Sequence, residues 1–135
     1  MAQEDKFKKE IDRIGLVLAK LLGMLLNKKD HPQEAVQDVM QQTYDELGID
    51  IEQLLAVTDG DDIDFLVNNK KFSTEHLKHF GDLLYELARY SNAQQQKLLL
   101  AKAMNIYRYI SAHARTLYLD IEYRLKDQSD INPHS

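Results

Sequence analysis

The sequence predicts an all-α protein of about five to seven helices, arranged as antiparallel helical hairpins with no β-sheet. Glycine and proline are scarce, with five and two residues in a chain of 135, so long helices are possible. Apolar residues recur at helical spacing, and no segment alternates with period two for long enough to form a strand. The length is typical of one domain, which we place at residues 1–126, followed by a disordered tail at 127–135.

The first predicted hairpin spans about residues 4–47. Its first helix covers about residues 4–29, where apolar residues recur every three or four positions. Its second helix covers residues 32–47, because proline is favoured in a first turn and Gly48 suits the left-handed position after a helix. In this second helix, the residues expected to face inward are Ala35, Val36, Val39, Met40, Thr43, Tyr44 and Leu47.

Two short helices are predicted between the hairpins, within about residues 50–68. Asp50 is followed three positions later by glutamine, an arrangement that caps a helix, here at about 51–57. Thr58 is the expected cap of the second short helix, at about 60–68.

The second predicted hairpin spans about residues 73–126. Ser73 or Thr74 is the expected cap of its first helix. The helical pattern then continues from 93 to 126 without a breaker, and as one helix it would be roughly 50 Å long. A domain of this size is about 35–40 Å across, so we expect this helix either to break near 111–113 or to project.

One local pattern occurs in both hairpins. Residues 11–18 and 77–84 each read apolar-x2-apolar-Gly-x2-Leu, and a later helix in each hairpin carries alanine four positions before a larger apolar residue. A glycine on one helix and an alanine on the next allow two antiparallel helices to approach closely. The four expected close-contact positions are Gly15, Ala35, Gly81 and Ala103.

This layout resembles the tetratricopeptide repeat (TPR), which combines such a glycine with a later alanine. The usual Trp and Tyr positions are aliphatic here, the Gly-to-Ala spacing is longer than in a regular repeat, and the closing proline is missing. The whole chain is similar to a bacterial family of small TPR-like all-helical domains without an assigned function. The resemblance implies a helical-hairpin fold and a protein-binding role, and it carries over no catalytic residue.

Charge is distributed unevenly along the chain, whose formal net charge is −5. Residues 1–29 and 70–135 are each net positive, whereas residues 30–69 hold eleven acidic residues and no Lys or Arg. Nucleic-acid binding needs clustered positive charge, so we expect none. The acidic segment is interpreted either as a solvated face with helix N-termini or as a contact for a basic partner, such as the basic first helix of a second copy.

The cellular location is predicted from what the sequence lacks. The chain contains no cysteine, which excludes disulfides and thiolate metal sites and fits a reducing compartment. The first apolar run begins late and lacks a small-residue cleavage site, so a signal peptide is not expected. We therefore expect a cytoplasmic protein.

The most apolar stretch is residues 11–26. It is too short for a membrane span of about 20 residues, and Arg13 and Lys20 interrupt it, so we expect no stable membrane insertion. One apolar stripe accounts for one buried face, and further apolar residues need a second cover, from this chain or from a second copy. These self-association candidates are Leu16, Val17, Met24 and Leu26. We expect a homo-oligomer, with a dimer as the simplest form.

A second candidate surface lies in the C-terminal part of the chain, where tyrosines alternate with arginines. It is either the surface of an amphipathic helix or a partner-binding patch, since Tyr and Arg are enriched at interface hot spots. The partner-binding candidates are Arg108, Tyr109, Arg115, Tyr118, Tyr123 and Arg124.

Candidate catalytic and metal sites are weak. The acidic stretch around Gly60 lacks the ligand spacing of an EF-hand, and His76 and His79 are not accompanied by a Glu-x-x-His motif. No common catalytic motif occurs, so we expect no enzyme activity, no cofactor and no metal.

The sequence predicts a non-catalytic protein-interaction or scaffold module that self-associates. The alternative is a small-molecule-binding protein or enzyme with a pocket between the hairpins, using Tyr44, His113 and Tyr118.

Overall fold

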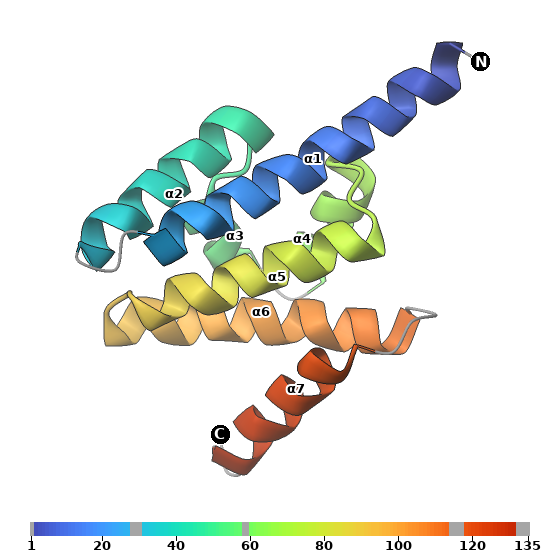
Figure 1. Ribbon diagram of the computed structural model, residues 1–135. Helices are drawn as coiled ribbons and strands as arrows, with labels where there is room; N and C mark the ends of the chain where they lie inside the picture. The colour runs from blue at the N-terminus through green and yellow to red at the C-terminus, as the bar shows by residue number, and fades with distance from the viewer. Residues whose placement is uncertain (1, 28–30, 58–59, 114–117, 132–135) are drawn as a thin grey trace.

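The computed structural model describes residues 2–27, 31–57, 60–113 and 118–131, and within these ranges it contains helices and no strand (Figure 1). The all-α fold predicted from the sequence is confirmed. In chain order the elements are α1 (Ala2–Asn27), α2 (Pro32–Leu47), α3 (Ile51–Ala56), α4 (Asp61–Asp64), a π-helical turn η1 (Phe65–Asn69), α5 (Thr74–Arg89), α6 (Ala93–His113) and α7 (Leu119–Ile131).

Two antiparallel pairs, α1 with α2 and α5 with α6, form the body of the protein (Figure 1). Helix α1 lies between α2 and α5 and contacts both, so its own chain covers it on two sides. The short helix α3 contacts α2 and α6 and thereby bridges the two hairpins. In the described residues, no helix is long and apolar enough to cross a bilayer.

The core is built from the apolar stripes that the sequence spacing indicates. The buried residues of α1 recur every three or four positions, as expected for one face of a helix. They are Ile14, Val17, Leu18, Leu21 and Leu25. Leucine, isoleucine and phenylalanine side chains of α5 and α6 fill the space opposite, and among the described residues the largest fully buried side chain is Tyr107.

The predicted helix ends in the first half of the chain agree with local backbone chemistry. Gly48 has a φ of +67° after α2, and its N–H donates to the Tyr44 carbonyl at 2.9 Å. The Asp50 carboxylate accepts a hydrogen bond of 3.2 Å from the Gln53 N–H and so caps α3. Thr58, the expected cap of the next helix, lies outside the described residues.

Helix α5 begins with a reciprocal capping box in which histidine takes the place usually held by Glu or Gln. The Ser73 hydroxyl accepts from the His76 N–H at 3.2 Å, and the His76 Nδ1 accepts from the Ser73 N–H at 3.1 Å. His76 is buried, whereas its neighbour His79 is exposed. His76 therefore has a structural role at the start of α5.

The long helical pattern of residues 93–126 is divided into two helices. Helix α6 ends at His113, within the range where a break was expected, and α7 reverses direction and runs obliquely away from α6 (Figure 1). The expected tail beginning at residue 127 starts too early, since α7 continues to Ile131. No helix-breaking residue occurs before Pro133, so nothing in the local sequence ends the helix sooner.

The two glycines of the shared pattern have different surroundings. A Cβ on Gly15 would lie 3.8 Å from the His76 Nε2 of α5 and would meet no atom of α2 within 4 Å, so the expected contact with the helix of Ala35 is wrong. A Cβ on Gly81 would lie 2.9 Å from Tyr107 Cε1 and 3.3 Å from Ile106 Cγ2, both on α6, the helix of Ala103. The alanines Ala35 and Ala103 are both buried.

These distances predict opposite effects of the same substitution. Gly15→Ala should stabilise the fold by about 0.5–1 kcal/mol, because alanine is the better helix former and the new methyl makes ordinary contacts. Gly81→Ala should destabilise it by about 1–2 kcal/mol, because the methyl overpacks against the buried Tyr107 ring. Urea unfolding followed by circular dichroism measures both, and equal stabilisation by both variants would contradict the close contact at Gly81.

Candidate functional site

A continuous groove lies between α2, α3 and the start of α6. It consists of three neighbouring depressions with volumes of about 530, 560 and 310 Å³, and Glu52 of α3 lines all three. The middle depression shares Gln37 and Met40 with one neighbour and Asn92 and Gln95 with the other. Helix α3 contacts both α2 and α6, so it connects the two walls of the groove on this side of the molecule.

One wall of the groove is the face of α2 that turns away from α1. Three glutamines at four-residue intervals, Gln33, Gln37 and Gln41, form a row along it. In an α-helix this interval places successive side chains about 6 Å apart on one face. Met40 and Tyr44, also four positions apart, lie beside this row, so the wall carries an amide row and an apolar pair side by side.

The opposite wall comes from α3, the α5–α6 turn and the start of α6. Asn92 caps α6, since its side-chain oxygen accepts from the Gln95 N–H at 2.9 Å. Leu55 and Leu98 add apolar surface, and Tyr90 lines the middle depression. Asn92 and Gln95 thus continue the mixture of amides and apolar side chains found on α2.

Two large apolar side chains remain exposed at the ends of this groove. Tyr44 is 56% exposed and Leu98 is 46% exposed. Tyr44 was expected to face inward, and this expectation is wrong, because Val39, Thr43 and Leu47 occupy the buried face of α2. Helix geometry turns Tyr44 about 100° away from Thr43 and into the groove.

The charge of the groove has one sign. Asp50 and Glu52 are the charged residues among those that line the three depressions, and no Lys, Arg or His lines them in the described part of the chain. Both carboxylates belong to the segment 30–69, which has no Lys or Arg. A ligand in the groove therefore meets amide, apolar and acidic groups.

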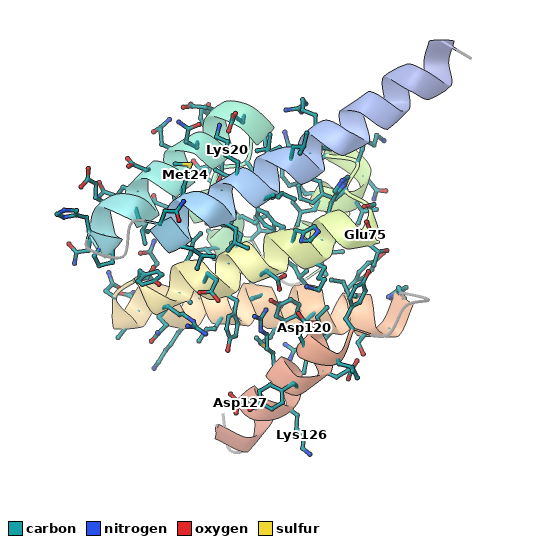
Figure 2. All side chains as sticks on the ribbon, viewed as in Figure 1. Lys20, Met24, Glu75, Asp120, Lys126 and Asp127 are labelled. Atoms are coloured by element: carbon teal, nitrogen blue, oxygen red, sulfur yellow. The ribbon has the colours of Figure 1, made fainter. Side chains whose placement is uncertain are left out.

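A second polar cluster, the α7 anchor, connects α5, α6 and α7. It consists of Lys78, Asp82, Tyr107, Asp120 and Arg124. The Asp82 carboxylate accepts hydrogen bonds from the Tyr107 hydroxyl at 2.6 Å, from Arg124 at 2.7 Å and from Lys78 at 2.9 Å. Lys78 also pairs with Asp120 at 3.0 Å, and Figure 2 labels Asp120 near the start of α7.

These contacts shift the pKa values within the α7 anchor. Burial raises the pKa of Tyr107, and its hydrogen bond to Asp82 raises it further, so the hydroxyl remains a donor at neutral pH. Partial burial works to lower the pKa of Lys78, but hydrogen bonds to Asp82 and Asp120 outweigh it and raise the pKa. Partial burial works to raise the pKa of Asp120, but the hydrogen bond from Lys78 and the nearby positive charges outweigh it, so the pKa is lowered. At neutral pH, Tyr107 is therefore neutral, Lys78 is positively charged and Asp120 is negatively charged, which are the states that these hydrogen bonds and ion pairs need.

The predicted tyrosine and arginine surface is divided between internal and external roles. Arg124 belongs to the α7 anchor and lies over the Tyr85 ring at 4.4 Å, while Tyr118 is half-buried beneath Lys78. The other members have no contact in common. Tyr109 stacks on His113, with ring centroids 4.2 Å apart, and Arg108 donates to Asn105. Tyr123 is exposed on α7, and Arg115 lies outside the described residues. The five of these residues that the structure describes do not form one exposed patch, and a partner-binding role for the exposed ones stays a prediction.

The four self-association candidates of α1 also separate. Val17 lies in the core and Met24 is half-buried against it, so this chain supplies part of the second cover. Leu16 is 72% exposed and Leu26 is also exposed. Nearby, Lys20 pairs with Glu46 of α2 at 2.9 Å, and Figure 2 labels Lys20 and Met24 on α1. Leu16 and Leu26 are the members available to a second copy.

The residues of the alternative small-molecule site are not brought together. Tyr44 lines the groove, whereas exposed His113 lies at the end of α6, with its Nδ1 2.9 Å from the Tyr109 carbonyl. Tyr118 packs near α5, beside Lys78. The described residues contain no group of three or more His, Asp or Glu placed to hold a metal ion.

Sequence reasoning missed one buried ion pair inside the acidic stretch near Gly60. Asp62 of α4 is 1% exposed and pairs with Lys102 of α6 at 3.2 Å; the Lys102 amine also donates to the Val57 carbonyl. Lys102 follows apolar residues on α6 and is itself almost completely buried. A lysine on the core side of a helix is the sequence signal that would have pointed to this pair.

Comparisons with protein-family models, with curated proteins and with solved structures found no match for this chain. The TPR-like ancestry indicated by the sequence therefore stays a prediction, and function has to be inferred from this chain's own residues.

Proposed function

We propose that this protein is a non-catalytic interaction module that binds a peptide segment of a partner protein in the groove between α2, α3 and α6. The observation that carries the proposal is the lining of the groove: amide side chains lie beside apolar side chains over three connected depressions, and Tyr44 and Leu98 are exposed. Amides both donate and accept hydrogen bonds, so they can pair with the N–H and C=O groups of a peptide backbone.

The absence of catalytic activity is part of the proposal. The ionisable groups with shifted pKa values, such as Tyr107 and Lys78, have their partners within the α7 anchor and do not line the groove. A catalytic acid or base needs a shifted pKa in a site that a substrate can enter. The groove instead offers contact groups, which suit binding.

Self-association is a further part of the proposal, because a second copy is one partner that such a module can bind. The apolar surface at Leu16 and Leu26 of α1 is the place where we expect copies to meet. This surface is separate from the lining of the groove, so the two contacts can be tested independently.

Site-specific photocrosslinking in the native cell tests both contacts. Benzoylphenylalanine at Tyr44 should crosslink to a partner polypeptide, and the same group at Leu16 should give a product of two copies of this chain. His79, exposed on α5, is the matched control position and should give neither product. Mass spectrometry identifies the products. Partner crosslinks at Tyr123 but not at Tyr44 would move the binding site to α7, and a lack of products at Tyr44 and Leu16 would refute the proposal.

A further inference from the structure

We propose that the groove selects an extended peptide segment in which Lys or Arg lies beside apolar residues. This inference rests on the proposed function and specifies the partner chemistry of the same groove. Three features of the groove support it: the spacing of its amides, the placement of its apolar groups and its single sign of charge.

The amide spacing fits an extended backbone. Gln33, Gln37 and Gln41 repeat about every 6 Å along α2, and an extended chain presents equivalent groups on one side about every 6.5–7 Å. Gln33 and Gln37 can therefore contact alternate residues of one bound strand with small side-chain adjustments, whereas the Gln41 amide already donates to Asp45 at 3.0 Å. No hydrogen bond within the described part of the chain engages the side-chain amide of Gln37 or of Gln95 on the opposite wall.

The apolar groups favour an extended peptide over an amphipathic helix. A helix in a groove needs a continuous apolar trough for anchors on one face. Here Met40 and Tyr44, four positions apart, are neighbours on α2, whereas Leu55 and Leu98 line a different depression. The middle depression places Gln37, Asn92 and Gln95 between these two apolar pairs, so the apolar trough is interrupted. An extended peptide directs alternate side chains to opposite sides, so it can place apolar groups at separate positions and still pair its backbone with the amides.

The negative charge of the groove determines which sign of charge a bound peptide should carry. Asp50 and Glu52 line the groove without a cation beside them in its lining, and Glu52 contacts all three depressions. The surrounding segment 30–69 adds further carboxylates and no Lys or Arg. Charge complementarity speeds association and disfavours acidic segments, so a peptide carrying Lys or Arg near Glu52 is the favoured occupant.

Selection from a display library of random 12-residue peptides tests this inference with the full-length protein. Enriched peptides should contain Lys or Arg beside aliphatic or aromatic residues. The best of them, labelled with fluorescein, should compete for crosslinking at Tyr44. In fluorescence anisotropy at low salt, the double variant Asp50→Asn, Glu52→Gln should bind this peptide about fivefold to tenfold more weakly. Gln37→Ala should weaken binding severalfold at any salt concentration.

Glu75→Gln is the matched control, because Glu75 is an exposed carboxylate at the start of α5 (Figure 2) and does not line the groove. It should leave the affinity unchanged. Peptides that bind at Tyr44 without a preference for positive charge, or that become helical when bound, would overturn this inference and leave the proposed function standing. If no selected peptide competes at Tyr44, both the inference and the proposed groove fail. Selection of a sequence present in this chain supports the inference and identifies a second copy as the partner.

Discussion

Replacing Lys102 with methionine is expected to lower the free energy of unfolding by about 3–5 kcal/mol, the largest single effect that we predict. The substitution keeps most of the side-chain volume but removes the charge that faces Asp62. The Asp62 side chain is 1% exposed, and its Oδ2 has no hydrogen-bond partner in the described structure apart from the ion pair at 3.2 Å. A carboxylate left alone there has neither water nor a cation to stabilise it.

The double variant Asp62→Leu, Lys102→Met separates the cost of burial from the value of the pair. It removes both charges, so it should recover most of the stability that Lys102→Met loses. Lys20→Met is the control, since Lys20 and Glu46 form an exposed pair whose loss should cost less than about 1 kcal/mol. Urea unfolding measures all three variants, and a loss below about 1 kcal/mol for Lys102→Met would show that Asp62 keeps access to water.

Features that depend on neighbouring residues were predictable from the sequence. Gly48 ends α2, Asp50 caps α3 and Ser73 caps α5, as their residue types and spacing indicate. Each requires only that a side chain or a flexible backbone reach a group within a few positions. The all-α class follows from the same local information, because helical spacing of apolar residues extends over most of the chain.

Features that depend on distant residues were not predictable in this way. Gly15 was paired with α2, yet the side chain nearest to it belongs to His76 of α5. Arg124 was assigned to an exposed patch, yet it reaches Asp82, 42 positions earlier. A helical pattern indicates which face of a helix is buried, but not which helix covers that face. Which residues contact Gly15 and Arg124 depends on the order in which the helices pack.

The groove shows the same division between local and distant information. The row of glutamines on α2 is visible in the sequence, and so is the acidic character of residues 30–69. The opposite wall comes from Asn92, Gln95 and Leu98, which α3 brings close to α2. One wall alone is an ordinary polar helix face, so the groove became recognisable only when both walls were in place.

Replacing Asp82 with alanine is expected to loosen α7 and to lower the free energy of unfolding by about 2–3 kcal/mol. The carboxylate of Asp82 accepts hydrogen bonds from α5, α6 and α7 simultaneously. Without it, the Tyr107 hydroxyl is left buried without its acceptor, and Arg124 keeps the hydroxyl and the Tyr85 ring but loses its ion pair. Since burial keeps Tyr107 protonated, the hydroxyl cannot replace the lost negative charge at neutral pH.

Amide hydrogen exchange locates the effect of Asp82→Ala within the fold. Exchange should accelerate most in α7, where Ile121 is the one buried side chain among those described, while the α1–α2 hairpin keeps its protection. Tyr107→Phe keeps the ring and removes one donor, so it should cost about 1 kcal/mol and leave Arg124 paired with Asp82. Glu86→Ala is the control, because Glu86 lies on α5 like Asp82 but pairs with the exposed Arg89. This variant should leave the amides of α7 protected. Equal exchange in all four proteins would mean that apolar contacts alone hold α7 in place.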